Sequence, residues 1–244
     1  MAAPTVLTNA TIWYGGYDLT GATNEVTFNA ARAEKPVSRF GDTIEATYPG
    51  AQTVDAEVKG FWDSTLDGPQ FTQLTTPSTS WPLTICPDGA DDGEVAFDIQ
   101  AYSFSYSALE AQWGQSLPYR LSAKAKSGSG LSRGEVMFPK TVFSASVPGT
   151  KRLVGAISAT QKAVAMLHVF AIDGGSWLFR FQSDADAVAG GETQRGVFVA
   201  VTTAPSRQAI EIAGPITDTY WLALCNQTGG TSVTAAVTFA IVDA

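Results

Sequence analysis

The sequence has few of the residues that catalysis and metal binding most often use. Its 244 residues include one histidine, His168, and two cysteines, Cys86 and Cys225, far apart in the chain. No zinc site of ordinary ligand spacing can be assembled from them, and a nucleophile–histidine–acid arrangement would have to use His168. That residue lies in the apolar run AVAMLHVFAI, which predicts a hydrogen-bonded core histidine. We therefore expect no enzyme activity and no cofactor.

Long apolar runs and charged residues are also scarce. No stretch approaches the roughly 20 apolar residues of a membrane span, and the N-terminal MAAPTVLTNA lacks the basic start and apolar run of a signal peptide. We expect a chain that is made in the cytosol, without disulfides and without membrane binding of its own. Charged residues make up only 16% of the sequence, against a typical value of about a quarter.

The charge that is present is unevenly distributed. Residues 1–143 hold 9 basic and 16 acidic residues, whereas residues 144–244 hold 6 and 7, so the net charge of −8 comes mainly from the first segment. An acidic chain does not bind phosphate backbones by charge attraction. It could instead line a passage through which nucleic acid slips without sticking.

Period-two alternation of apolar and polar residues predicts an all-β fold. In residues 53–59, Val54, Ala56 and Val58 alternate with polar side chains, and residues 94–105, 119–127 and 232–242 alternate similarly. The best helix candidate is DGPQFTQLT, residues 67–75, where proline suits the first turn. Charge density falls near residues 140–150, which predicts two domains: a β-sandwich with one short flanking helix over 1–143, and an antiparallel β-sandwich over 144–244.

Two further groups of residues are candidate binding sites. The acidic turn PDGADDGE could offer calcium the oxygens of Asp88, Asp91, Asp92 and Glu94. Its spacing fits no EF-hand loop, however, and acidic residues are common in turns, so an ordinary acidic loop without metal is favoured. In the second domain Trp177, Tyr220 or Trp221 could stack on a sugar, whereas the simpler interpretation places them in the core or at its rim.

Several segments of residues 5–140, taken in order, resemble the tail tube proteins of long-tailed bacteriophages. They are GGYDLTGATNEVTF, RFGDTIEATYPGAQTVDAEVKGFWD, DGEVAFDIQAYSFSYS and SGLSRGEVMF. In that family an FGD-like tag precedes a glycine-containing turn, and the alternating strand that follows ends in GFWD-like residues. The resemblance implies a β-sandwich with a flanking helix. Residues 144–244 look like the extra β domain that is often appended to phage structural proteins on their outer surface.

The resemblance also implies a structural role in assembly. Family subunits form hexameric rings whose inner sheets join edge to edge, and the rings stack into a hollow tube for genome passage. Asp55, Glu57, Lys59 and Asp98 would then face an acidic lumen, in transient contact with viral DNA. On an isolated monomer the same residues would be an ordinary solvated sheet face.

Other parts of the chain receive roles by the same resemblance. Arg39, Phe40, Gly41, Asp42 and Tyr48 would contact a neighbouring subunit or ring. Partners would be further copies of this chain and other phage tail proteins, in a virion assembled in the host bacterial cytoplasm. The alternatives are a capsid decoration or other virion accessory protein, and a carbohydrate-binding module in residues 144–244.

Overall fold

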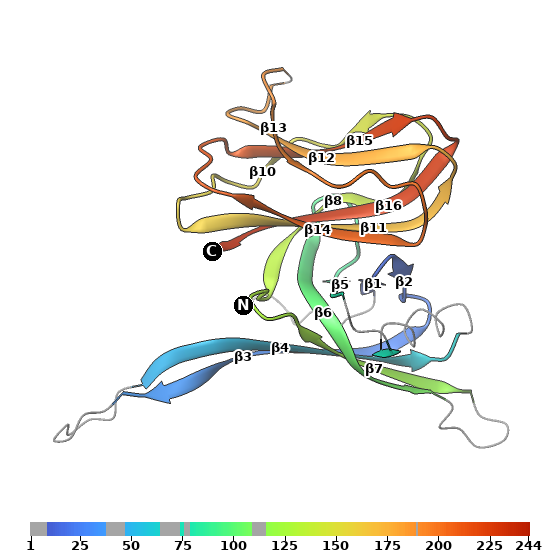
Figure 1. Ribbon diagram of the computed structural model, residues 1–244, viewed down its shortest axis with the longest axis vertical. Coiled ribbons are helices and arrows are strands. Elements are labelled where there is room, and N and C mark those ends of the chain that lie inside the picture. Colours follow the sequence, from blue (N-terminus) through green and yellow to red (C-terminus); the bar gives the residue numbers. More distant parts are fainter. Residues whose placement is uncertain (1–8, 38–46, 64–73, 76–78, 109–115, 189) are drawn as a thin grey trace. The chain divides into compact units, whose positions relative to one another are not determined.

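The regular structure of the chain consists almost entirely of antiparallel β-strands, which confirms the predicted all-β class (Figure 1). The computed structural model describes residues 9–37, 47–63, 74–75, 79–108, 116–188 and 190–244. The predicted helix at 67–75 falls mostly outside these residues, although Leu74 and Thr75 are helical. Among the described residues, none belongs to a helix with the length and apolar character needed to cross a membrane.

The chain divides into two compact units, each assembled from separate stretches of sequence. Unit 1 comprises residues 1–21, 81–99 and 132–244, and unit 2 comprises residues 22–80 and 100–131. Strand β6 (Val95–Ala108) contributes its first residues to unit 1 and the remainder to unit 2. These units do not follow the boundary that the sequence suggested, because the strands on either side of residue 143 both belong to unit 1.

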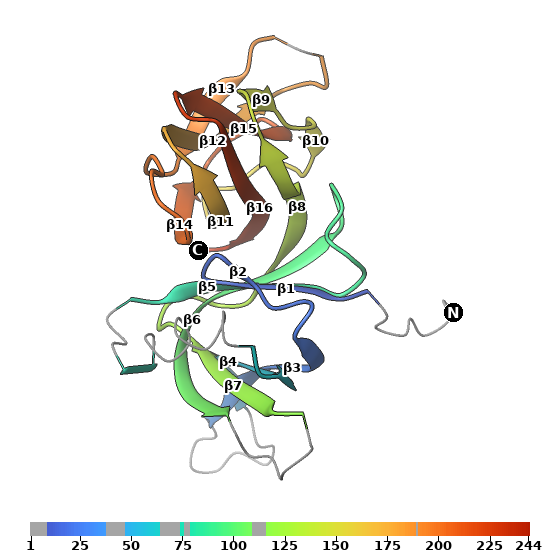
Figure 2. The same ribbon diagram turned by 90° about the vertical axis from the view of Figure 1, so that its right-hand side faces the viewer.

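Unit 1 contains an antiparallel sandwich whose two layers are visible in Figure 2. One layer has the order β14-β11-β16-β8 and is part of a larger sheet that continues from β8 into β6, and the other is a sheet of the order β10-β15-β12-β13, with β9 also paired to β15. The strands of the first sheet are β8 (Ser132–Phe143), β11 (Gln161–Asp173), β14 (Ser206–Ala213) and β16 (Ser232–Asp243). Those of the second are β9 (Val147–Pro148), β10 (Arg152–Leu153), β12 (Ser176–Asp184), β13 (Thr193–Val197) and β15 (Tyr220–Thr228).

The core of this sandwich is built from aromatic side chains of both sheets. Phe239 on β16 lies 4.9 Å from Phe181 on β12 and 4.8 Å from Trp221 on β15, measured between ring centroids. All three side chains are fully buried. Period-two alternation places them on the inner faces of their strands. Strands β1 (Thr11–Tyr14), β2 (Tyr17–Asp18) and β5 (Trp81–Cys86) complete unit 1 next to the start of β6.

Unit 2 is a sheet of long antiparallel strands. β3 (Thr23–Pro36) pairs with β4 (Thr47–Phe61), β4 pairs with β7 (Pro118–Ala125), and β7 pairs with the second half of β6. Gly60 permits the close approach of the chain at the start of β3, because a Cβ at this position would collide with the carbonyl group of Ala22. The buried face of this sheet carries Val54, Val58 and Leu121.

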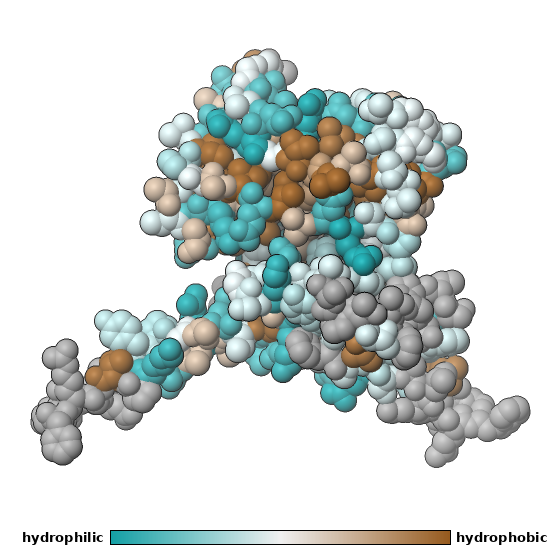
Figure 3. All heavy atoms as spheres, viewed as in Figure 1, coloured by the Kyte–Doolittle hydropathy of each residue, from teal (hydrophilic) through white to brown (hydrophobic). Residues whose placement is uncertain are grey.

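Exposed apolar side chains are distributed differently in the two units. In unit 1, apolar atoms gather in a band between the two sheets (Figure 3). The large apolar side chains of unit 1 that are most exposed to solvent are those of Val142, Leu153, Val188 and Val199. The surface of the β3–β4 pair in unit 2 is mainly hydrophilic or intermediate, with isolated apolar side chains (Figure 3).

Candidate assembly surface

Strand β4 has the alternation that the sequence predicted. Val54, Ala56 and Val58 are at most 3% exposed, whereas Asp55, Glu57 and Lys59 are partly exposed on the other face. Because successive side chains of a strand point to opposite faces, these three polar residues lie in one row. The row continues onto the neighbouring strands, where the register places Glu25 opposite Lys59 and Lys124 opposite Asp55.

The polar row is a ladder of ion pairs across three strands, which we call the charge ladder. It comprises Glu25, Asp55, Glu57, Lys59, Arg120 and Lys124. The Lys59 amine lies 2.6 Å from a Glu25 carboxylate oxygen and 3.8 Å from one of Glu57. Arg120 donates a hydrogen bond to the other carboxylate oxygen of Glu57, and the Lys124 amine lies 3.7 Å from a carboxylate oxygen of Asp55. Each acidic side chain of the ladder thus has a basic neighbour.

This pairing changes the expected electrostatics of the face. The charge ladder holds equal numbers of acidic and basic side chains, so its net charge is zero. The sequence suggested an acidic wall because it identified Asp55 and Glu57 on β4 but not Arg120 and Lys124 on β7 as members of the same face. Exposed ion pairs contribute only about 0–1 kcal/mol each to stability. The main consequence of the ladder is therefore a polar face without net attraction for polyanions.

Asp98 does not belong to this face, which corrects the prediction that grouped it with Asp55, Glu57 and Lys59. Its side chain is 1% exposed inside unit 1, where Thr84 donates a hydrogen bond to it. The sequence pattern placed Val95, Phe97 and Ile99 of β6 on the core face, and this holds only for Ile99. Ala96 and Asp98 are buried instead, while Val95 and Phe97 are partly exposed. A carboxylate buried in this way cannot face a lumen.

Strands β3 and β4 extend together beyond β7. The register between β4 and β7 covers only Asp55–Phe61 of β4, whereas the register between β3 and β4 continues to Pro36 and Thr47. Residues 30–36 and 47–54 therefore form a two-stranded ribbon, which we call the β3–β4 ribbon. Among the described residues, no further strand pairs with either of its edges. Residues 29–35 are all exposed.

An isolated two-stranded ribbon is marginally stable in water. A long unpaired edge also presents a row of N–H and C=O groups that can accept another strand. The outer edge of β3 has this property along its whole length, because β3 pairs only with β4 in the described chain. Among the described residues, the outer edge of β3 is therefore a long strand edge at which another chain could pair.

The predicted subunit-contact loop is only partly described. Arg39, Phe40, Gly41 and Asp42 lie outside the described residues. Tyr48 is on β4 within the β3–β4 ribbon, opposite Lys35, and is 67% exposed. An aromatic side chain with this exposure is a suitable anchor for a protein contact.

One carboxylate of the acidic turn 87–94 is paired with an arginine from another strand. Arg152 on β10 makes a two-pronged contact with Asp92, with its Nε and one terminal nitrogen 3.1 Å and 3.0 Å from the two carboxylate oxygens. Asp88 and Asp91 are exposed, and Glu94 is partly exposed. Among the residues that the structure describes, no cluster of three or more histidine, cysteine, aspartate or glutamate side chains is arranged to hold a metal ion.

Two of the three candidate sugar-stacking residues lie in the core, as the simpler interpretation of them expected. Trp177 and Trp221 are 0% exposed, and their indole nitrogens donate to the carbonyl oxygens of Gly174 and Gly155 at 3.3 Å and 2.8 Å. Tyr220 is partly exposed. A buried indole ring cannot stack on a glycan, so these tryptophans serve the core.

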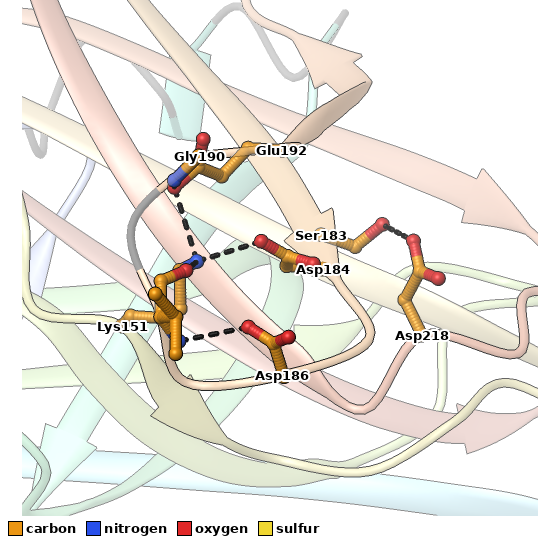
Figure 4. Close-up of polar contacts among 8 residues, drawn as sticks. Lys151, Ser183, Asp184, Asp186, Gly190, Glu192 and Asp218 are labelled. Carbon is orange, nitrogen blue, oxygen red and sulfur yellow. Dashed lines mark hydrogen bonds and ion pairs between the residues drawn. The ribbon is translucent and has the colours of Figure 1, made fainter.

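A second polar cluster in unit 1 orders the loop between β12 and β13 (Figure 4). The Lys151 amine lies 2.8 Å from Asp184 and 3.0 Å from Glu192, and it donates to the carbonyl of Val188 at 2.5 Å. These contacts hold the pKa of Lys151 above its ordinary value and that of Asp184 below its own. The lysine side chain is only 11% exposed. The charge of Lys151 is therefore neutralised by its own acidic neighbours, and the cluster is best explained as a structural anchor for these loop residues.

No family model matches the sequence, and no curated protein matches it. Several solved structures are similar in fold. One is a chain from the "virion of native gene transfer agent (GTA) particle", with 9% identity, a TM-score of 0.42, and coverage of 53% of this chain and 99% of the other. Another belongs to the sheath–tube complex of PVC, an extracellular contractile injection system, with 12% identity, a TM-score of 0.42, and coverage of 55% and 93%.

A third similar structure spans both units. It is the SPP1 Dit protein (gp 19.1), with 12% identity, a TM-score of 0.34, and coverage of 96% of this chain and 99% of the other. All three TM-scores lie below 0.5, and none of the three identities exceeds 12%.

Proposed function

We propose that this protein is a structural virion subunit that pairs its unit 2 sheet with copies of itself, forming rings that stack into a phage tail tube. The observation that carries this proposal is the β3–β4 ribbon, whose edges have no strand partner among the described residues. Closing several sheets around an axis satisfies such edges, as any barrel closure does. The sixfold symmetry, the stacking and the passage of DNA follow from the sequence resemblance to tail tube proteins.

Self-assembly is the first test of this proposal. We expect the purified full-length chain to form rings or hollow tubes as its concentration rises, measured by sedimentation velocity and negative-stain electron microscopy. A chain that stays monomeric at high concentration, also in the presence of preformed tube seeds, would contradict the proposal. A monomer that instead decorates preformed capsids would support the capsid accessory alternative.

The charge ladder supplies a lumen wall in this proposal. Its acidic and basic side chains are paired within one subunit, so a ring of subunits would present a polar wall without net charge. DNA would then pass because the wall offers no net attraction, rather than because an acidic wall repels it. Binding of DNA to proteins depends on cationic side chains that neutralise phosphates and release counterions.

A charge reversal at the ladder tests this assignment. We expect tubes of Asp55→Lys to retain short double-stranded DNA at low salt, because the net charge of the ladder then rises from zero to +2 in each subunit. Retention should be measured as nuclease-protected DNA in washed tubes, and raising the salt concentration should release it. Unmodified tubes should retain at least about tenfold less DNA, since their ladder is neutral.

Lys124, the ion-pair partner of Asp55, offers matched controls for this experiment. Lys124→Asp should leave retention at the unmodified level, because it makes the face acidic, and the double variant Asp55→Lys/Lys124→Asp should return to that level because the pair is restored with opposite polarity. If Asp55→Lys tubes form normally but protect no DNA, the charge ladder does not line the lumen. That result would leave the assembly proposal intact.

A further inference from the structure

Unit 1 contains a buried chain of three polar side chains. The Thr84 hydroxyl on β5 donates a hydrogen bond to the Asp98 carboxylate on β6, and its oxygen lies 2.9 Å from Nε2 of His168 on β11. All three side chains are at most 1% exposed. The imidazole ring also lies 5.8 Å from the ring of Trp13 and stacks on that of Phe170 at 6.3 Å, measured between centroids.

The hydrogen-bond roles in this chain follow from the carboxylate. An ionised carboxylate can only accept, so the Thr84 proton points to Asp98. The Thr84 oxygen must then accept from His168, which requires the tautomer with its proton on Nε2. Nδ1 is left as a buried acceptor with no hydrogen-bond partner among the described residues.

We propose that Asp98, Thr84 and His168 form a proton relay that reverses its hydrogen-bond polarity when it takes up one proton. The proton enters at Nδ1 of His168, the Nε2 proton passes to the Thr84 oxygen, and the original Thr84 proton passes to Asp98. The product holds one more proton in total. Asp98 is then a neutral acid that donates to Thr84, Thr84 donates to Nε2, and His168 is neutral with its proton on Nδ1.

The environment determines which residue keeps the added proton. Burial raises the pKa of Asp98 to about 6, opposed by the hydroxyl groups of Thr84 and Thr238, and burial lowers the pKa of His168 to about 3. The carboxyl group therefore holds the proton and the imidazole stays neutral. Thr238 is close enough to affect this pKa, although its hydroxyl does not meet the geometry of a hydrogen bond.

The surrounding elements contribute other titratable groups. On β14 the guanidinium of Arg207, the register partner of His168, lies 3.7 Å over the ring of Trp81, and burial lowers its pKa. On β5 the thiol of Cys86 is buried, and its raised pKa is due mainly to burial and then to the negative charges of Asp98 and Glu94. On β8 Glu135 is partly buried, with a raised pKa that Arg152 opposes. None of these groups is a cause of the shift at Asp98. The relay should therefore titrate as one unit.

The single histidine makes the relay directly observable. We expect ¹⁵N NMR of the full-length protein to show the Nε2–H tautomer of His168 at pH 8 and the Nδ1–H tautomer at pH 5, with a midpoint near the pKa of about 6 at Asp98. No imidazolium signal should appear in this range. A tautomer that does not change between pH 8 and 5, or an imidazolium forming near pH 6, would overturn the proposal.

Two variants distinguish proton transfer through the Thr84 hydroxyl from an effect of burial alone on the His168 tautomer. Thr84→Val keeps the shape of the side chain but removes the hydroxyl, and we expect the His168 tautomer to become independent of pH. The matched control, Thr238→Val, lies next to the same carboxyl outside the relay and should retain the switch, with a shifted midpoint. If Thr84→Val retains the switch with an unchanged midpoint, the hydroxyl is not part of the proton path. If a variant fails to fold, the pH dependence of the His168 tautomer in the unmodified protein still tests the proposal.

Discussion

Replacing residues 32–52 with the dipeptide Asn-Gly is expected to give a folded chain that no longer assembles. Ala31 and Thr53 are register partners, so a two-residue type I′ turn can join them without disturbing the rest of β3 and β4. The change removes most of the β3–β4 ribbon and shortens the outer edge of β3. Each backbone hydrogen bond contributes about 0.5–1.5 kcal/mol net, and about 1.4 kcal/mol is tenfold in an association constant.

Loss of several such bonds should raise the concentration needed for assembly by at least about a hundredfold. Circular dichroism should show a folded β protein, and sedimentation velocity should show a monomer. A control variant keeps the ribbon and replaces only residues 38–46 with a Gly/Ser loop of equal length. If it forms rings that do not stack, the loop makes the ring-to-ring contact. Normal tubes from the shortened chain would contradict the role of the ribbon.

The second large effect is expected in the core of the unit 1 sandwich. Phe239→Ala removes a fully buried ring that packs between Phe181 and Trp221, on strands of the opposite sheet. Large-to-small substitutions of this kind cost about 3–5 kcal/mol, because they remove apolar burial and leave a cavity. We expect a loss of this size in the urea unfolding of monomeric protein, followed by the fluorescence of the core tryptophans.

Val199→Ala provides the control for this experiment. Val199 belongs to the same unit but is 77% exposed, so its truncation should change the free energy of unfolding by less than about 0.5 kcal/mol. A Phe239→Ala variant as stable as this control would show that the two sheets of unit 1 do not pack through that ring.

Local patterns predicted the strands well and the arrangement of the strands poorly. Alternation identified β4, β7 and β16, because a period of two is set by each strand alone. It also identified the buried face of β4, and the apolar run around His168 identified the burial of that residue, which is 0% exposed. On β6 alternation identified the buried Ile99 but missed Asp98, which looked solvent-facing by residue type. Its burial depends on Thr84, a partner from another strand that single-strand alternation does not reveal.

The neutral charge of the ladder and the length of the ribbon were missed for a related reason. Arg120 and Lys124 become neighbours of Glu57 and Asp55 only through the register of β7 with β4. The quoted segment GGYDLTGATNEVTF ends at Phe28, whereas β3 continues to Pro36. Its second half, AARAEKP, has no alternation, since both of its faces are exposed and neither requires apolar residues. A strand without a buried face leaves little signal in the sequence.

The pairing state of β3 within an assembly is the most direct test of the account. A cryo-electron microscopy reconstruction of the assembled protein should show the outer edge of β3 hydrogen-bonded to a strand of a neighbouring copy, around a central channel faced by Asp55 and Glu57. A reconstruction in which the β3 edge is open to solvent, or is covered by residues of its own subunit with no channel between copies, would contradict it.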